Sequence, residues 1–211
     1  MTSHRRRPRP LKRVAESRPE LRTVVVFTEG KKSEPEYVNE LKKLPHIDEN
    51  VALNVEVRPE HGVPLTLVKL AVARQTDREV DECWCIFDVE WPKNHPNLDA
   101  AVSLAQENDV KLAISNPCFE VWLTLHHKEL NKFEYTATVE SVSRALDKRA
   151  GKSIDAARYM PLRRKAAERA QNLDARHRRN GTKFPHDNPS SGMYKFLISL
   201  EGGNWLVAAR P

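Results

Sequence analysis

Short apolar runs alternate with amphipathic stretches of about ten residues over residues 21–127 of the chain. Runs rich in Val, Ile, Phe and Trp predict strands at 21–28, 51–57, 83–88 and 110–115. Apolar residues at helical spacing predict helices near 33–44, after Pro64, near 98–107 and at 118–126. Strands separated by helices of this length form βαβ units with right-handed crossovers, so we expect an α/β fold with a mostly parallel sheet flanked by helices.

The pattern divides the chain into four parts. Residues 1–20 are rich in Arg and Pro without periodicity, which predicts a disordered basic arm. The α/β core is expected at 21–127, followed by charged, helical sequence at 128–187 that we interpret as a basic helical insertion. A closing helix and a C-terminal tail fill 188–211. A chain of 211 residues can bury one core of this kind with a small appendage.

Composition narrows the expected cellular location of the protein. No apolar run approaches the roughly 20 residues of a membrane span, and the basic N-terminus lacks the apolar segment of a secretory signal. The three cysteines are odd in number, lie in apolar sequence and lack zinc-site spacing. We therefore expect reduced, buried thiols in a cytoplasmic protein that has no membrane partner. Homo-oligomerisation is left open.

The net charge of +6 is unevenly distributed. Residues 1–20 carry a net +5 and residues 141–186 a net +9, which leaves −8 on the remainder. An acidic core flanked by basic segments suits a metal-dependent enzyme acting on nucleic acid, because phosphates must be held while the metal site stays anionic. Charge runs are also common on plain solvated surfaces.

Acidic residues follow two of the predicted strands. Glu29 comes directly after the first strand, and the apolar run at 83–87 ends in Asp88 and Glu90. Open α/β sheets bind ligands outside the carboxyl ends of their strands, where these three acids would meet. Side chains alternate along a strand, so Asp88 and Glu90 are expected on one face. Oxygen-only ligands favour a hard cation such as Mg²⁺, with Mn²⁺ as a substitute.

Other residues near this edge have two interpretations each. Glu120, in the first turn of a helix, is a metal ligand or a partner of the helix dipole. Asn116 binds phosphate or caps that helix. Lys31 and Lys32 hold the scissile phosphate or are simply exposed. Ser33 is expected as the N-cap of the first helix.

Basic and histidine side chains further along the chain are candidates for nucleic-acid contacts and proton transfer. A subset of the insertion's basic residues is expected to form a phosphate-binding face: Arg163, Arg164, Lys165, Arg169, Arg176, Arg178 and Arg179. For His126, His127 and His186, packing or surface roles are favoured over proton transfer.

The order of these features resembles the Toprim fold: a strand, Glu29-Gly30 and a helix, then two units later a strand ending in Asp88-x-Glu90. In that resemblance Asp88 and Glu90 coordinate Mg²⁺, and Glu29 is a ligand or a general acid/base in phosphodiester chemistry. The usual pair is Asp-x-Asp, so Glu90 departs from the pattern, although its longer side chain can still reach a shared ion.

Four blocks make the resemblance narrower, namely TEGKKSEPEY at 28–37, WCIFD at 84–88, SNPCFEVW at 115–122 and NPSS at 188–191. Together they resemble the RloB-like family of bacterial restriction-linked proteins, over residues 21 to about 200. The family implies a Toprim-like nuclease whose relatives act in abortive-infection defence with a partner AAA-type ATPase. This chain has no P-loop motif, so the ATPase would be a separate protein.

The leading hypothesis is a magnesium-dependent endonuclease with catalytic Glu29, Asp88 and Glu90, acting on RNA, with tRNA as one candidate, or on DNA. In it, Glu120 joins these three as a metal ligand. The first alternative is a non-catalytic subunit that binds nucleic acid or the ATPase. A different phosphoryl-transfer or nucleotidyl-transfer enzyme is the second, because a fold does not fix a reaction.

Overall fold

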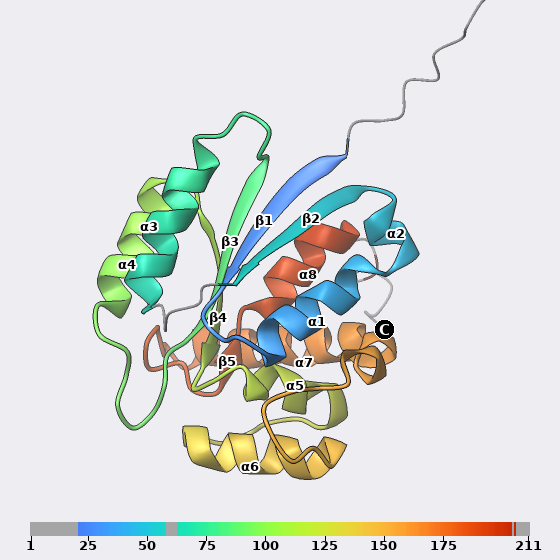
Figure 1. Cartoon of the computed structure of the whole chain (residues 1–211). Coiled ribbons are helices and arrows are strands. Elements are labelled where there is room, and N and C mark those ends of the chain that lie inside the picture. Colours follow the sequence, from blue (N-terminus) through green and yellow to red (C-terminus); the bar gives the residue numbers. More distant parts are fainter. Residues whose placement is uncertain (1–20, 58–62, 204, 206–211) are drawn as a thin grey trace, which may run out of the picture.

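A five-stranded sheet lies at the centre of the molecule, with strand order β2-β1-β3-β4-β5 (Figure 1). The computed structural model describes residues 21–57, 63–203 and 205, so the basic arm expected at 1–20 lies outside the described residues. Four strands are mutually parallel: β1 Arg22–Thr28, β2 Val51–Val57, β3 Glu82–Asp88 and β4 Lys111–Asn116. A two-residue strand, β5 Ser190–Ser191, pairs antiparallel with β4. The predicted α/β class with a mostly parallel sheet is confirmed.

Eight α-helices accompany the sheet in the described part of the chain. They are α1 Ser33–Lys42, α2 Pro45–Asp48, α3 Pro64–Gln75, α4 Leu98–Glu107, α5 Glu120–His127, α6 Thr136–Asp147, α7 Arg163–Arg179 and α8 Met193–Glu201. Two 3₁₀ turns, Ala156–Arg158 and Met160–Leu162, precede α7. Helices α3 and α4 cover one face of the sheet, and α1 and α8 cover the other (Figure 1).

The central strands are apolar throughout because both of their faces are covered. Side chains alternate between two apolar clusters, so that Trp84 and Ile86 pack with α1, α5 and α8 while Cys83, Cys85 and Phe87 pack with α3 and α4. All three cysteines are buried, free thiols.

Buried apolar residues of the segment 128–187 belong to the same cluster as those on the face of the sheet covered by α1 and α8. Helix α7 buries Ala166, Ala167, Ala170 and Leu173. Small side chains let a helix approach its neighbour closely, and α7 accordingly packs against α5. Because its charged residues occupy the remaining sides, α7 is basic outside and apolar where it meets the core.

Three local features differ from the sequence predictions. Ser33 is not an N-cap, because its hydroxyl donates instead to the backbone oxygen of Lys152, 2.6 Å away. Pro45 begins the short helix α2 after α1 has ended at Lys42, since proline is favoured in a first helical turn. The strand β5 is too short to produce a periodic pattern.

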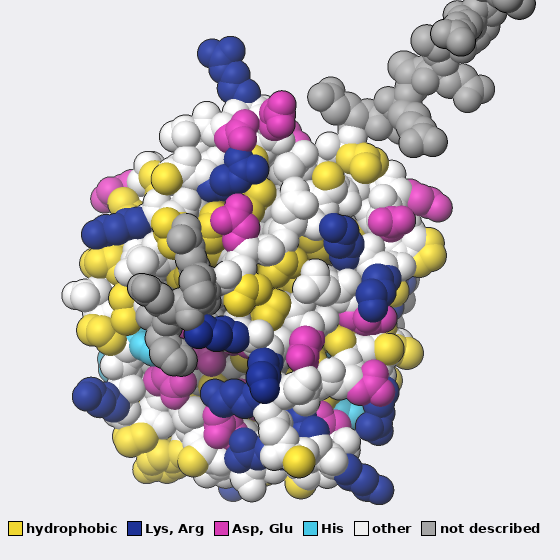
Figure 2. All heavy atoms as spheres, in the orientation of Figure 1, with side chains coloured by type: hydrophobic (Ala, Val, Ile, Leu, Met, Phe, Trp, Pro, Cys, Tyr) yellow, Lys and Arg dark blue, Asp and Glu magenta, His cyan; other side chains and the backbone are white. Residues whose placement is uncertain are grey.

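The surface mixes charges of both signs. Figure 2 shows Lys and Arg side chains lying among Asp and Glu side chains on the face viewed. Among the residues described, no helix is long and apolar enough to cross a membrane.

Candidate functional site

An acidic pocket lies where β1 and β3 end and α1 and α5 begin. It has a volume of about 350 Å³. Its lining includes six carboxylate side chains, which are Glu29, Glu34, Asp88, Glu90, Glu120 and Glu140. His95, Lys31, Lys32 and Lys152 line the same pocket. The structure therefore brings together the four acids predicted from the sequence and adds two that were not predicted.

Glu29 is fixed by hydrogen bonds to both of its carboxylate oxygens. Its backbone N–H donates to the Ile86 carbonyl oxygen (3.1 Å), which extends the pairing of β1 with β3 by one residue. Oε1 lies 2.7 Å from His95 Nε2, and Oε2 accepts from the Asp88 backbone N–H at 3.2 Å. The hydrogen bond to Glu29 raises the pKa of His95. Glu29 is thus held at the strand end by His95 and by the Asp88 backbone.

Asp88 ends β3 with an unsatisfied side chain. Its Oδ1 is enclosed by protein and has no hydrogen-bond partner. Burial raises the pKa of Asp88 well above its usual value, and the nearby charges of Glu34, Glu29, Glu120 and Glu90 raise it further. Buried carboxylates are normally paired or hydrogen-bonded. An unpartnered oxygen facing other acids is the arrangement that a cation would satisfy.

Glu34 joins the pocket from the first turn of α1 and was not predicted as a site residue. Burial, together with the charges of Glu120 and Glu29, raises its pKa to about 7. A Cβ atom at Gly30 would lie 2.1 Å from Glu34 Oε2, so only glycine leaves room for this carboxylate. The signal in the sequence was the Glu-Gly-x-x-x-Glu spacing, in which a turn of helix returns over the glycine.

Glu90 lines the pocket as predicted, but its position does not result from strand alternation. Strand β3 ends at Asp88, and Glu90 has a left-handed backbone with φ of 67°. Its N–H donates to the Pro117 carbonyl oxygen at 2.8 Å. Strand alternation therefore does not place Glu90; a tight turn held by the loop before α5 does. Burial raises the pKa of Glu90.

Glu120 is already paired with a cation. Its Oε1 lies 3.6 Å from Arg149 Nη2, and both side chains are less than one-tenth exposed. This ion pair gives Glu120 a structural role in addition to its predicted role as a metal ligand. Because α5 has no side-chain cap, Asn116 does not cap it either.

The loop after α6 brings Lys152 into the pocket from far along the chain. Ser33 Oγ donates to the Lys152 carbonyl oxygen, and Glu36 accepts from Ser153 Oγ at 2.6 Å and from the Ile154 N–H at 2.7 Å. Although burial lowers the pKa of Lys152, the charges of Glu140, Glu120, Glu34 and Asp88 raise it overall. Lys152 is therefore held as a cation among acids, which the sequence alone could not show.

Asn116 and the basic residues of α7 lie elsewhere. Asn116 Nδ2 donates to Pro185 O and Asp187 Oδ1, both at 2.9 Å, and so holds the loop that returns to β5. Six other basic residues were predicted to bind nucleic acid. In the structure they form ion pairs with acidic side chains, donate to carbonyl oxygens or line a second pocket: Arg163, Arg164, Lys165, Arg176, Arg178 and Arg179. The acidic pocket is lined by none of these seven side chains. Their nucleic-acid contacts stay a prediction.

His126 is a packing residue. Its ring lies within hydrogen-bonding distance of the Tyr37 hydroxyl (3.1 Å) and the Trp122 carbonyl oxygen (2.9 Å). Burial lowers the pKa of His126 to about 3, so the ring stays neutral. Neither His127 nor His186 lines the acidic pocket.

The chemistry of the pocket fits a hard divalent cation. The available donors are carboxylate oxygens, and Asp88 Oδ1 lacks a partner. Over residues 21–57, 63–203 and 205, however, no three Asp, Glu, His or Cys side chains are arranged so as to hold a metal ion. Glu29 is bound by His95 and Glu120 by Arg149. Coordination would therefore require these side chains to rotate within the pocket.

Comparison with known proteins identifies a family. A family model described as RloB-like protein matches residues 24–200. No curated protein and no solved structure matches the chain.

Proposed function

The chain belongs to the RloB-like protein family, and on that premise we propose that it is a magnesium-dependent endonuclease, hydrolysing phosphodiester bonds in RNA or DNA. One observation carries the proposal. Asp88 has an enclosed oxygen without a hydrogen-bond partner and shares its pocket with five other carboxylates. Burial, and after it the negative charge of neighbouring carboxylates, raises the pKa values of Asp88 and Glu34. Ionisable groups perturbed in this way inside a pocket are typical of functional sites.

Asp88, Glu29, Glu90 and Glu34 are the residues proposed to hold the cation, with Glu120 as a further ligand. Bound Mg²⁺ would polarise the phosphoryl oxygens and make water a better nucleophile at neutral pH. The pKa values of Asp88 and Glu34 are raised by burial and, after it, by the charges of neighbouring carboxylates; a divalent cation would offset that repulsion.

The other pocket residues have roles that follow from their contacts. His95 Nε2 lies 2.7 Å from Glu29 Oε1 and helps to keep that carboxylate beside the other acids. Lys31, Lys32 and Lys152 line the pocket beside the acids, where their charge would attract a phosphodiester. Substrate phosphate and cation would then be held by oppositely charged parts of one pocket.

The biological setting is proposed from family membership alone. We infer a cytoplasmic role in antiphage, abortive-infection defence, with tRNA among the candidate RNA substrates and a separate AAA-type ATPase as partner. The lack of a P-loop in the sequence supports a separate ATPase chain.

The test is cleavage of mixed cellular RNA and plasmid DNA by the purified protein with Mg²⁺, Mn²⁺ or chelator, with and without the neighbouring ATPase. We expect metal-dependent products, reduced at least about 10³-fold in Asp88→Asn and Glu29→Gln. Asp99→Asn, an exposed acid on α4, is the matched control and should keep full activity. If nothing is cut even with the ATPase, or if Asp88→Asn cuts normally, the catalytic proposal is wrong and a binding subunit is the better interpretation.

A further inference from the structure

Three aromatic side chains are in contact near the acidic pocket; Phe133 and Tyr135 are exposed, and Trp91 is half-buried. The ring centroids of Trp91 and Phe133 are 5.2 Å apart, and those of Phe133 and Tyr135 are 5.9 Å apart, both edge to face. Phe133 is 48% exposed and Tyr135 is 54% exposed. Single exposed apolar residues are ordinary, whereas exposed rings in contact with one another are a candidate binding surface. We call these three residues the aromatic surface.

The segment that carries Phe133 and Tyr135 is firmly attached to the rest of the fold. Between them, Glu134 is buried, and its N–H donates to Asn188 Oδ1 at 3.0 Å. Its carbonyl oxygen accepts from Asn188 Nδ2 at 2.8 Å. One buried amide thus binds both backbone groups of Glu134, so the aromatic residue on either side of it is displayed on an anchored backbone. This anchoring assigns a role to Asn188 in the NPSS block.

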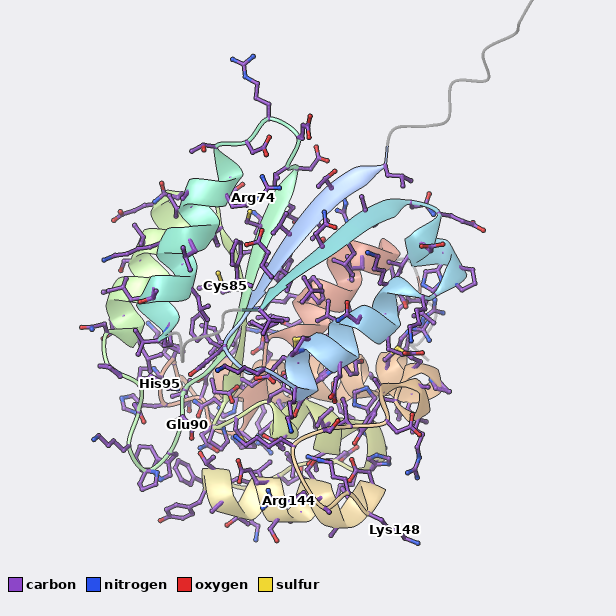
Figure 3. The ribbon with its side chains drawn as sticks, viewed as in Figure 1. Arg74, Cys85, Glu90, His95, Arg144 and Lys148 are labelled. Carbon is purple, nitrogen blue, oxygen red and sulfur yellow. The ribbon has the colours of Figure 1, made fainter. Side chains whose placement is uncertain are left out.

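The aromatic surface adjoins the acidic pocket along the chain. Trp91 directly follows Glu90, which lines the pocket. The Trp91 N–H donates to Thr136 Oγ1 at 3.0 Å, and the Thr136 N–H donates to the Trp91 carbonyl oxygen at 3.3 Å. These two bonds fasten the turn after β3 to the start of α6. Figure 3 shows Glu90 and His95 on that turn, below the sheet and above α6.

We propose that the aromatic surface stacks an unpaired nucleobase of a single-stranded nucleic acid whose backbone enters the acidic pocket. This inference rests on the proposed nuclease function. Exposed aromatic rings bind nucleobases face to face and tolerate any sequence. In a duplex the bases stack on one another and are not available, so the surface selects single strands, loops and bulges.

Charge around the rings favours nucleic acid over an apolar protein partner. Lys93 lies two residues after Trp91, and Lys132 directly precedes Phe133; both are exposed. Cations next to stacking rings are the usual means of holding a single strand, because they contact phosphates while the rings contact bases. The same lysines would be costly to desolvate in an apolar protein interface.

The experiment compares binding of a fluorescein-labelled 12-residue single-stranded RNA with binding of the matching duplex, by anisotropy in chelator so that no cleavage occurs. Loss of a stacking ring weakens binding by about five- to one-hundred-fold per base. We expect a loss in this range for the single strand when Phe133→Ala and Tyr135→Ala are combined, and less than about twofold for the duplex. The aromatic exchanges Phe133→Tyr and Tyr135→Phe should retain binding. Leu162→Ala, another exposed apolar residue, is the matched control and should change nothing.

Failure of this inference can be told apart from failure of the nuclease proposal. If Asp88→Asn abolishes cleavage but the double alanine variant binds single strands normally, the nuclease proposal stands and the aromatic surface is not a base-stacking site. If nothing is cut but the double alanine variant loses single-strand affinity selectively, the aromatic surface is a base-stacking site and catalysis is wrong. Equal losses for strand and duplex overturn the inference. So does a double variant that changes only self-association or ATPase capture.

Discussion

Asp88 and Glu201 are both enclosed carboxylates, but the molecule treats them in opposite ways. The Glu201 side chain is 0% exposed, and its oxygens lie 2.5 Å from Arg163 Nε, 2.9 Å from Arg164 Nε and 3.1 Å from His46 Nε2. Although burial raises the pKa of Glu201, hydrogen bonds from the two arginines lower it overall. Asp88 has acidic neighbours instead, and its pKa is raised.

The difference separates a structural charge from a functional one. A buried carboxylate that serves the fold is neutralised by cations of the same chain, as Glu201 ties α7 to α8. A carboxylate left among like charges costs stability, and such a cost is characteristic of a site that binds a ligand. The comparison also reduces the number of basic side chains available to bind nucleic acid, because Arg163 and Arg164 form ion pairs with Glu201.

Filling the space above Gly30 should strongly reduce cleavage. Gly30→Ala places a Cβ against the Glu34 carboxylate and should displace it from the pocket. We expect cleavage to fall by about 10²- to 10³-fold, because small misplacements of catalytic groups are costly. Gly151→Ala, where an added Cβ meets no atom within 4 Å, is the matched control. Equal activity in the two variants would show that Glu34 does not act in the pocket.

Removing each enclosed charge should affect stability in opposite directions. Glu201→Gln leaves Arg163 without its charged partner, and we expect the free energy of unfolding to fall by about 2 kcal/mol. Asp88→Asn removes a repelled charge and should leave that energy unchanged or raise it. Denaturant unfolding at pH 8 in chelator measures both. A large destabilisation by Asp88→Asn would mean that Asp88 is a structural residue.

The two kinds of carboxylate should also respond oppositely to pH. Because the pKa of Glu34 is raised from 4.5 to about 7, its contribution to stability is present below pH 4.5 and lost as pH rises through about 7. The pKa of Glu201 is lowered, so its contribution is present above pH 4.5 and lost as pH falls below that value.

Glu34→Gln should therefore raise the free energy of unfolding at pH 8 by about 1–2 kcal/mol relative to wild type, in chelator, and change it little at pH 4.5. Unfolding curves at the two pH values test this. A pH-independent difference between the proteins would contradict the assigned shift.

Much of the fold follows from the sequence because the apolar pattern is strong. The four parallel strands lie at the predicted positions. Glu29 directly follows β1 and Asp88 ends β3, so both lie at the edge where parallel strands present their carboxyl ends. The two-residue β5 has no pattern to detect, and its pairing depends on Asn116 holding the loop before it.

The parts that were missed depend on contacts between distant segments. His95 and Lys152 reach the pocket from loops, and Lys152 does so through bonds to α1 about 120 residues away in sequence. The many arginines of α7 look equivalent in the sequence, but only the tertiary structure shows that Glu201 binds two of them. Phe133 and Tyr135 read as ordinary loop residues until Asn188 is seen to anchor the segment between them.

The most direct test of the central claim is calorimetric titration of Mg²⁺, and of Mn²⁺, into the wild-type protein, Asp88→Asn and Glu201→Gln. If Asp88 and the carboxylates around it form the cation site, the wild-type protein and Glu201→Gln should bind the cation with the same affinity. Asp88→Asn should bind it at least about tenfold more weakly. Equal affinity in all three proteins, or no binding by the wild type, would contradict the claim.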